Sequence, residues 1–375
     1  MCNGLLNPAQ YREPQALADE HALIFARTWN FVGLLFEQEA GQHRGVKLGA
    51  TSLIIQCDKQ GRPRAFLNVC SHRHAQLCEQ GVHRGPIRCP YHSWTYDREG
   101  IPAGIPQPQA FPEVIADKSA HRLKEFACET VGQFIFVRLS TDGPSLRDYL
   151  GPEYDFLLHA SAGMNGLIDE FRQDVHANWK AVIENSLEGY HVPAVHNQTF
   201  MKVEGMERGH QAPVDTVQHP LHSSIDHPAA ADWLVTFERK IAPKIGSWAW
   251  RFPHYTHHLI FPNLTVTSFL GYSFHIQRFE PSAVGITTVH SRTVSVGFTG
   301  QSPVGAKMVE QIYAESKSFT ERVFAEDAAI CRAVQQGLEC AERPAVIGNG
   351  IEDRVLHFQR AYQRCMNPTS PPPPT

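Results

Sequence analysis

The stretch Asn178–His196, which reads NWKAVIENSLEGYHVPAVH, carries acids and histidines within a largely apolar run. Glu184, Glu188 and His191 stand at i, i+4 and i+7, a spacing that places three side chains on one face of a helix. Their apolar neighbours draw this face toward the protein interior, where a charged side chain needs a partner or a metal ion. The spacing therefore predicts a helix with a stripe of possible metal ligands.

Pro193 lies two residues after His191 and disfavours a continuous helix. In an unbroken helix, His191 and His196 would point about 140° apart. A break at the proline lets His196 turn back toward a metal that His191 faces. The two histidines then need one carboxylate to complete the 2-His-1-carboxylate set that binds non-haem Fe(II). The competing interpretation is a helix before a loop, with each histidine bonded to backbone carbonyls.

Two short loops upstream carry a second set of possible metal ligands. Cys70 and His72 belong to the run Cys-Ser-His, and Cys89 and His92 belong to the run Cys-Pro-Tyr-His. Zinc accepts both ligand types, but zinc fingers usually present two cysteines followed by two histidines. The alternating order suits a Rieske [2Fe–2S] cluster, in which one iron takes thiolates and the other takes imidazoles. We therefore favour a Rieske cluster over zinc, with Trp94 covering it from water.

The composition restricts the class of protein. A chain of 375 residues can form two domains, and its 42% hydrophobic and 19% charged residues are ordinary for a globular protein. A net charge of -4 favours neither nucleic acid nor an anionic membrane as partner. We expect a cytoplasmic protein, since the N-terminus lacks signal-peptide character and no apolar run is long enough to span a membrane. The nine scattered cysteines argue against a disulfide framework.

Short strands and a few helices must position these residues. Helices are predicted over 14–28, 305–338 and 351–364, and strands over 29–35, 52–56, 65–69, 133–139, 259–269, 272–279 and 286–298. The last three strands predict an antiparallel meander. The segment 203–232, rich in His, Pro and Asp, is expected to be irregular and near an active site. Residues 367–375 form a polar, proline-rich tail.

Together, these motifs make the chain resemble the α-subunits of Rieske non-haem iron oxygenases, the ring-hydroxylating type. The matching motifs, in the order of the family, are NVCSHRHAQL, RCPYHSWTYDREG, NWKAVIENSLEGYHVPAVH and AEDAAICRAVQQGL. The resemblance implies an α+β fold. A Rieske β-domain would span 36–152, and a catalytic domain of the helix-grip type, with a curved antiparallel sheet and helices, would combine 1–35 with 153–366.

The resemblance also implies the cofactors and the residues that hold them. A [2Fe–2S] cluster would be held by the four residues of the two loops, Cys70, His72, Cys89 and His92. A mononuclear Fe(II) would be held by His191, His196 and the acid at the matching position, Asp327. Periodicity alone does not choose between Asp327 and its neighbour Glu326, because the helix there is apolar nearly all round.

Two further residues are expected to serve catalysis, Glu188 and Asn185. As the resemblance implies, Glu188 would orient the ring of His191 and bridge it to a cluster histidine, His92 or His72, of a neighbouring subunit. Many members of the family carry Asp at the position of Glu188. Glutamate there resembles the branch that oxidises quaternary ammonium compounds.

The cluster loops depart from the family pattern at two positions. His74 and Ser93 stand where the family commonly has glycine. The ligands themselves are intact, but these changes bear on the geometry of the loops and on the reduction potential of the cluster.

The leading hypothesis is an oxygenase that hydroxylates or oxidatively demethylates a small organic substrate with O₂ and NAD(P)H-derived electrons. The chain has neither a GxGxxG fingerprint nor a plant-type iron–sulfur motif, so we expect a separate NAD(P)H-dependent reductase with flavin and iron–sulfur centres. The resemblance implies a homotrimer, or an assembly of the trimer-of-trimers type. Two alternatives stay open: a Rieske electron carrier without oxygenase activity, and a zinc-stabilised interaction protein.

The substrate is left open between a quaternary ammonium compound and an aromatic acid. Several aromatic residues can form a cage for a quaternary ammonium group by cation–π attraction, or can serve as plain core. These residues are Trp248, Trp250, Phe252, Tyr255, Phe261 and Phe269.

Overall fold

The computed structural model describes residues 2–39, 41–58, 60–202, 216–228, 239–240, 242–245, 254–269, 271, 273–297 and 302–367. The chain divides into two compact units. Phe25–Tyr149 forms one, here called the cluster unit, and Met1–Ile24 together with Leu150–Thr375 forms the other, the catalytic unit. The cluster unit starts before the boundary expected at 36, because strand β2 (Asn30–Leu34) pairs with β11 (Phe134–Arg138).

The cluster unit is built on antiparallel strands. Within its described residues, seven strands form one sheet in the order β2-β11-β10-β5-β4-β3-β6, and β7-β8-β9 form a smaller sheet. The further strands are β3 (Gln42–Leu48), β4 (Thr51–Cys57), β5 (Pro63–Leu67), β6 (Gly81–Arg84), β7 (Ile87–Arg88), β8 (Thr95–Tyr96), β9 (Pro102–Gly104) and β10 (Glu125–Val131). The helical turns are η2 (Leu35–Glu37), η3 (Pro108–Ala110), α3 (Pro112–Ala116), η4 (Ser119–His121) and α4 (Leu146–Leu150).

The catalytic unit contains a larger antiparallel sheet. Its described strands follow the order β12-β18-β17-β16-β15-β14-β13. They are β12 (Met164–Val175), β13 (Thr216–Gln218), β14 (Ser223–Pro228), β15 (His254–Ile260), β16 (Leu264–Phe269), β17 (Ser273–Ala283) and β18 (Ile286–Val296). A short pair, β1 (Cys2–Asn3) with β19 (Val346–Ile347), ties the N-terminus to the C-terminal part of the chain.

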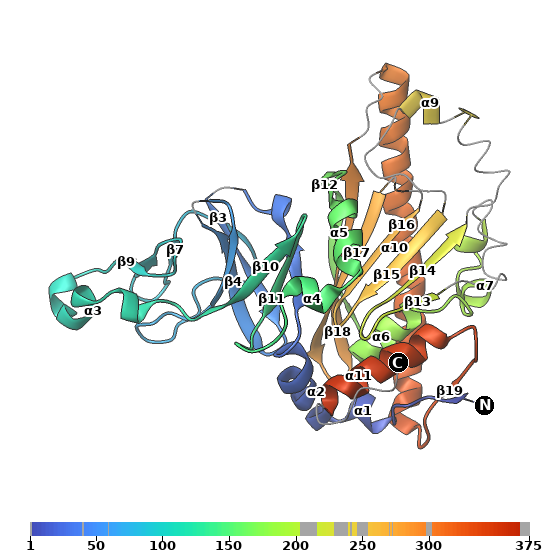
Figure 1. The fold of residues 1–375 in the computed structure, drawn as a ribbon, viewed down its shortest axis with the longest axis horizontal. Coiled ribbons are helices and arrows are strands. Elements are labelled where there is room, and N and C mark those ends of the chain that lie inside the picture. The colour runs from blue at the N-terminus through green and yellow to red at the C-terminus, as the bar shows by residue number, and fades with distance from the viewer. Residues whose placement is uncertain are drawn as a thin grey trace. The chain divides into compact units, whose positions relative to one another are not determined.

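Helices of the catalytic unit cover this sheet and close its ends (Figure 1). They are α1 (Ala9–Arg12), α2 (Pro14–Glu20), the π-helix η1 (His21–Phe25), α5 (Glu153–Ser161), α6 (Trp179–Ser186), α7 (Val192–Val195), η5 (Phe200–Lys202), α9 (Ala242–Ile245), α10 (Pro303–Cys340) and α11 (Asp353–Met366).

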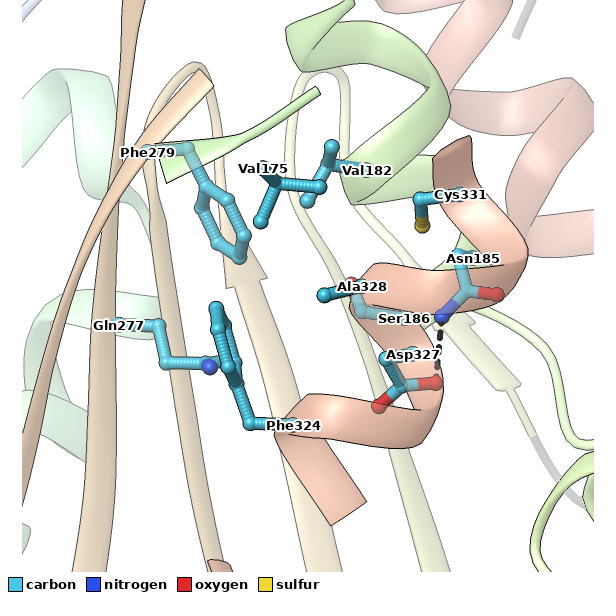
Figure 2. Close-up of a pocket in the computed structure, with 10 residues that line it drawn as sticks. All are labelled: Val175, Val182, Asn185, Ser186, Gln277, Phe279, Phe324, Asp327, Ala328 and Cys331. Carbon is cyan, nitrogen blue, oxygen red and sulfur yellow. Dashed lines mark hydrogen bonds between the residues drawn. The ribbon is translucent and has the colours of Figure 1, made fainter. Parts of the chain in front are cut away.

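The two faces of the sheet meet different helices, because side chains alternate along each strand. Gln277 and Phe279 of β17 point into a cavity that α6 and α10 also line (Figure 2). On the opposite face, His258 of β15 lies 2.6 Å from the carboxylate of Glu153 in α5. The sheet is therefore covered by α5 on one face and by the pair α6 and α10 on the other.

A buried ion pair fixes α6 against the N-terminal helices. Lys180 Nζ donates to Glu20 Oε1 at 2.5 Å, and both side chains are fully buried. Trp179 Nε1 and the hydroxyl of Tyr362 in α11 donate to the same carboxylate, at 2.6 and 2.9 Å. A buried charge pair is tolerated only when its remaining hydrogen bonds are satisfied. This network holds the start of α6 in one position.

Most of the predicted helices and strands are confirmed, and two expectations for segments after residue 200 are wrong. The strand expected over 259–269 is two strands, β15 and β16, because the chain turns at 261–263 and pairs Ile260 with Leu264. The segment 203–232 was expected to be irregular, but its described part, 216–228, forms the paired strands β13 and β14. The rest of that segment, and the tail beyond Asn367, lie outside the described residues.

Candidate active site

The helix that carries the first candidate ligands is shorter than predicted. The side chain of Asn178 caps α6, which then ends at Ser186. Glu184, Glu188 and His191 therefore do not share one helical face, and that prediction is wrong. Glu188 and His191 lie beyond the last turn, where the chain changes direction.

A turn closed by Glu188 takes the place of the predicted helical turn. Its Oε2 accepts the backbone N–H of His191 at 3.1 Å as well as that of Tyr190, and its Oε1 contacts His191 Nδ1. Pro193 lies in the first turn of α7, where proline fits. The chain therefore breaks before the proline rather than at it, and His191 and His196 cap the two ends of the short helix α7.

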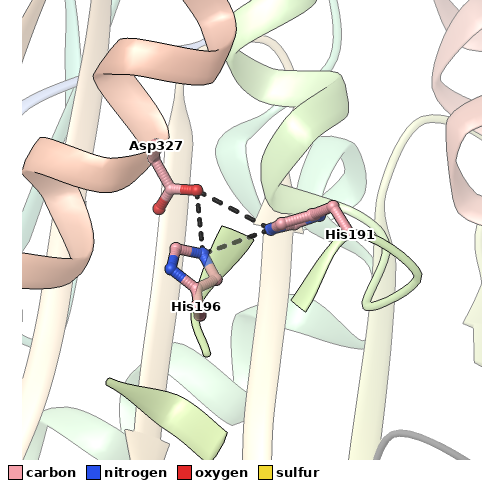
Figure 3. A group of neighbouring side chains, drawn as sticks. All are labelled: His191, His196 and Asp327. Atoms are coloured by element: carbon pink, nitrogen blue, oxygen red, sulfur yellow. Dashed lines mark hydrogen bonds and ion pairs between the residues drawn. The ribbon is translucent and has the colours of Figure 1, made fainter. Parts of the chain in front are cut away.

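This break brings three candidate ligand atoms together (Figure 3). His191 Nε2 lies 3.3 Å from His196 Nε2, and Asp327 Oδ1 lies 3.1 Å from His196 Nε2 and 3.7 Å from His191 Nε2. One donor atom of each residue lies within 4.8 Å of the others. Metal–nitrogen bonds of about 2.0–2.1 Å leave neighbouring ligands at such separations, so the set fits one metal ion.

Each ligand atom is oriented by a further side chain. Glu188 contacts Nδ1 of His191, and Glu326 Oε2 lies 2.7 Å from Nδ1 of His196. When a carboxylate accepts the Nδ1–H, the imidazole presents Nε2 as its free nitrogen. Asn185 Nδ2 donates to Asp327 Oδ1 at 2.8 Å, which turns that oxygen toward the two histidines.

The two neighbouring acids of α10, Asp327 and Glu326, contact different nitrogens of His196. Asp327 approaches the ligand nitrogens, whereas Glu326 lies behind His196 and also accepts the hydroxyl of Thr199 at 2.6 Å. Burial lowers the pKa of His196, but the hydrogen bonds and charges of Asp327 and Glu326 outweigh burial and raise it overall. The geometry thus favours Asp327 over Glu326 as the candidate third ligand, the choice that periodicity left open.

In the cluster unit, the two candidate cysteines share one buried cluster, and the two candidate histidines lie next to each other. Cys70 and Cys89 are buried in one apolar cluster with Ile54, Phe66 and Leu123. The rings of His72 and His92 lie 4.7 Å apart.

One buried nitrogen of each candidate histidine is unsatisfied. Among the described residues, Nδ1 of His72 and Nδ1 of His92 are buried without a hydrogen-bond partner. Burial, the neighbouring His92 and Arg73 lower the pKa of His72, which favours the neutral imidazole that binds metals. Two buried thiols beside two unbonded imidazole nitrogens are the donor set that a Rieske cluster needs.

The two loops share one backbone conformation, which explains why the family favours glycine there. His74 has φ 60° and Ser93 has φ 61°, in the left-handed region that glycine adopts at low cost. Their N–H groups donate to the carbonyls of Cys70 and Cys89, both at 3.0 Å. The departures from glycine therefore keep the loop geometry, at the cost of some backbone strain.

Two aromatic residues enclose the position of the cluster. The ring of Trp94 stacks on His72 at 4.9 Å and is buried, as expected for a side chain that excludes water. The hydroxyl of Tyr96 lies 3.1 Å from Cys70 Sγ and also accepts the N–H of Ser71 at 3.0 Å. Sequence reasoning missed Tyr96. Its position, four residues after His92, was the available signal.

Some residues singled out from the sequence lie elsewhere. Glu184 points away from the metal ligands and accepts hydrogen bonds from Tyr11 at 2.7 Å and from Gln359 at 2.9 Å. Desolvation raises its pKa to about 7. Phe261 is fully buried core. Of the other proposed cage residues, Trp248, Trp250, Phe252 and the side chain of Phe269 lie outside the described residues.

Comparison with known proteins identifies the class. Residues 164–368, more than half of the chain, match the family described as ring hydroxylating alpha subunit (catalytic domain), and residues 28–126 match the Rieske [2Fe–2S] domain. The chain belongs to the ring-hydroxylating alpha-subunit family, whose cofactors are a Rieske cluster and a mononuclear iron. The predicted cofactors are thereby confirmed.

Individual relatives show which members of the family this chain resembles in sequence. The chain is 36% identical over 190 residues to the oxygenase subunit of glycine betaine monooxygenase from Chromohalobacter salexigens, covering 50% of this chain and 42% of the relative. It is 29% identical over 215 residues to the large subunit of anthranilate 1,2-dioxygenase from Acinetobacter baylyi, covering 55% and 45%. The chain thus spans less than half the length of these relatives.

A solved structure of the quaternary ammonium Rieske monooxygenase CntA shares the fold. It matches with a TM-score of 0.78 and 20% identity, over 97% of this chain and 95% of that chain. The predicted fold class, a Rieske domain joined to a catalytic domain with an antiparallel sheet and helices, is confirmed. In the described part of the chain, no helix has both the length and the apolar character needed to cross a membrane.

The contact between Tyr96 and Cys70 generates a prediction. Tyr96→Phe should lower the reduction potential of the cluster by on the order of 50 mV, because a hydrogen bond to a thiolate stabilises the more negative, reduced state. Redox titration followed by visible circular dichroism measures the potential. Tyr91→Phe is the matched control, since that hydroxyl bonds the exposed side chain of Arg73. Equal potentials in all three proteins would remove Tyr96 from this role.

The positions of Asp327 and Glu326 generate another prediction. Asp327→Ala should lose the mononuclear iron and keep the absorption of the cluster. Glu326→Ala should keep all three ligands and bind Fe(II) about tenfold more weakly, because the residue only orients His196. Iron analysis after equilibration at defined free Fe(II), together with visible spectra, tests both. If Glu326→Ala loses the iron and Asp327→Ala keeps it, Glu326 is the third ligand and Asp327 is not.

Proposed function

We propose that this chain is the oxygenase component of a Rieske system that hydroxylates or oxidatively demethylates a small organic substrate with O₂ and NAD(P)H-derived electrons. The observation that supports it most strongly is that one chain gathers His191, His196 and Asp327 within 4.8 Å and also carries the paired Cys–His loops. An electron carrier alone has no use for the first set, and a zinc-stabilised interaction protein needs no more than one of the two sets.

The side chains around the iron position have distinct tasks. Iron held there would supply O₂ activation, and a cluster held by the Cys–His loops would supply electrons one at a time. His191, His196 and Asp327 would hold the iron through three ligand atoms, and a 2-His-1-carboxylate set of this kind has open positions for further ligands. Glu188 and Glu326 hold the Nδ1 protons of the two histidines, and thus keep both imidazoles in the tautomer that binds metal.

The cavity beside Asp327 supports binding of an apolar group next to the iron. Phe279, Phe324 and Val182 line it, and such walls exclude water from the reacting atoms (Figure 2). Aromatic faces also attract a quaternary ammonium group.

We propose a quaternary ammonium compound as the substrate class, with an aromatic acid as the second candidate. Glu188 at its position and the similarity to a glycine betaine monooxygenase support the first. The similarity to an anthranilate dioxygenase and the rings of Phe279 and Phe324 support the second.

The partners follow from the same proposal. A separate NAD(P)H-dependent reductase with flavin and iron–sulfur centres supplies the electrons, because the chain has no nucleotide-binding fingerprint of its own. The oxygenase works in the cytoplasm as a ring-shaped homotrimer, in which Glu188 joins His191 to His92 or His72 of the neighbouring copy. The contact of Glu188 with Nδ1 of His191 supports this role.

Turnover tests the proposal directly. With a surrogate reductase, NAD(P)H and panels of quaternary ammonium compounds and aromatic acids, one class should give O₂ uptake matched by hydroxylated or demethylated product. Mass spectrometry with ¹⁸O₂ measures the incorporated oxygen. An iron-replete protein that accepts electrons but forms no oxygenated product with any compound would leave only the electron carrier.

Glu188→Gln tests the route of the electron. The variant should keep both metal centres and bind substrate, yet reoxidation of the reduced cluster by O₂ and substrate should slow by orders of magnitude. Single-turnover stopped-flow absorption measures the rate. Glu184→Gln is the matched control, because its carboxylate faces Tyr11 and Gln359 and should leave the rate unchanged. A wild-type rate in Glu188→Gln would show that this residue is not the bridge.

A further inference from the structure

The cavity beside Asp327 is lined by six apolar and four polar side chains among the described residues. Its volume is about 30 Å³, and its described lining is Val175, Val182, Asn185, Ser186, Gln277, Phe279, Phe324, Asp327, Ala328 and Cys331 (Figure 2). Asp327 is the charged residue of this lining, and its carboxylate faces the two histidines. A group that enters this cavity therefore meets hydrocarbon walls together with a few polar side chains, whose hydrogen bonds decide what they can bind.

Two of the three uncharged polar side chains of this lining already donate hydrogen bonds within the protein. Asn185 Nδ2 donates to Asp327 Oδ1 at 2.8 Å, and the hydroxyl of Ser186 donates to the carbonyl of Ile183 at 2.7 Å. Gln277 differs. Its Oε1 accepts the hydroxyl of Thr265 at 3.5 Å, and its Nε2 donates to no group among the described residues. This amide therefore brings free N–H donors to the cavity.

The sheet holds Gln277 in place. It lies in β17, opposite Thr265 of β16 and Ser291 of β18, so that strands pair on both sides of it. Thr265 engages the amide oxygen and thereby turns the nitrogen away from itself. In Figure 2 the side chain extends toward Phe324, on the same face of the strand as Phe279. A positioned donor beside apolar walls is the usual means by which a binding site orients its ligand.

We propose that Gln277 is a substrate-recognising residue, whose Nε2 donates to an acceptor oxygen of the substrate while the apolar part of the substrate lies against Phe279 and Phe324. The inference rests on the proposed oxygenase function. It narrows the substrate class to compounds that carry a carboxylate or carbonyl oxygen beside the group to be oxidised. Both proposed substrate classes contain such compounds, since betaines and aromatic acids each carry a carboxylate.

The chemistry of the site favours an amide in this role. Among the described lining residues there is no lysine or arginine, and Gln277 is the one whose donor nitrogen is left available for a substrate oxygen. A site built to bond a polar group discriminates against an analogue that lacks the group, because the donor of the site is then left unpaired. Gln277 would thus set both the affinity for the substrate and the orientation of the carbon that is oxidised.

Paired probes test this inference. Glycine betaine is compared with ethyltrimethylammonium, and anthranilate with aniline, so that each pair differs by the carboxylate. Binding to the iron-loaded, cluster-reduced protein is followed by the change in the electron paramagnetic resonance spectrum of its nitric oxide complex, which needs no turnover. Gln277→Leu removes the donor at similar volume. Gln311→Leu is the matched control, because that glutamine lies exposed on α10 and bonds Glu315.

The wild-type protein should bind the acid of one pair more tightly than the analogue without the carboxylate. Gln277→Leu should lower that preference about tenfold, the usual effect of removing a hydrogen bond to a charged group, while the analogue without carboxylate binds as before. Gln277→Glu, which keeps the shape and replaces the donor by a second carboxylate, should lower it further. Gln311→Leu should match the wild type.

Two results would overturn the inference. If the wild-type protein binds neither acid more tightly than its partner, the cavity does not select an acceptor oxygen. If it does, but both variants of Gln277 retain the full preference, another residue supplies the donor. Either result leaves the oxygenase proposal intact when O₂ uptake remains coupled to product, whereas the absence of product from every compound refutes the oxygenase proposal itself.

Discussion

The orientation of two imidazole rings is the constraint on which the rest of this structure depends. Glu188 contacts Nδ1 of His191, and Glu326 contacts Nδ1 of His196, so that both rings turn Nε2 toward Asp327. Neither ring would hold this position in a continuous helix, since residues five apart point in different directions. The end of α6 at Ser186, the turn closed by Glu188 and the short helix α7 are the local structures that make the arrangement possible.

In the cluster unit, too, the local backbone geometry brings ligand side chains together, but these ligands are cysteines and histidines. Two loops of like conformation each place one buried cysteine and one histidine beside the other pair. Positive φ at His74 and Ser93 lets each loop bond back to the carbonyl of its own cysteine. In both units, the chain accepts local strain or a break in regular structure where side chains must converge. Such conflicts between local preference and fold are typical of functional sites.

Much of this site could be predicted from the sequence, and the reasons for the failures are physical. Ligand types and spacing were enough to predict the Cys–His loops and the histidine pair, because few functions need cysteine and histidine in that order, whereas the choice of Asp327 needed the family resemblance. The helical face through Glu184 and Glu188 was wrong, since periodicity cannot register a turn closed by a side chain. Glu326 and Gln277 were out of reach, because their roles depend on contacts between strands and helices distant in sequence.

The central claim is that His191, His196 and Asp327 hold a mononuclear ferrous ion in the same chain as a Rieske cluster. Mössbauer spectroscopy of dithionite-reduced protein grown on ⁵⁷Fe tests it most directly, because each iron environment gives its own signal. The account predicts a reduced [2Fe–2S] cluster together with a mononuclear high-spin ferrous signal, the latter absent from His196→Ala. A spectrum that contains the cluster alone, in protein equilibrated with Fe(II), would contradict it.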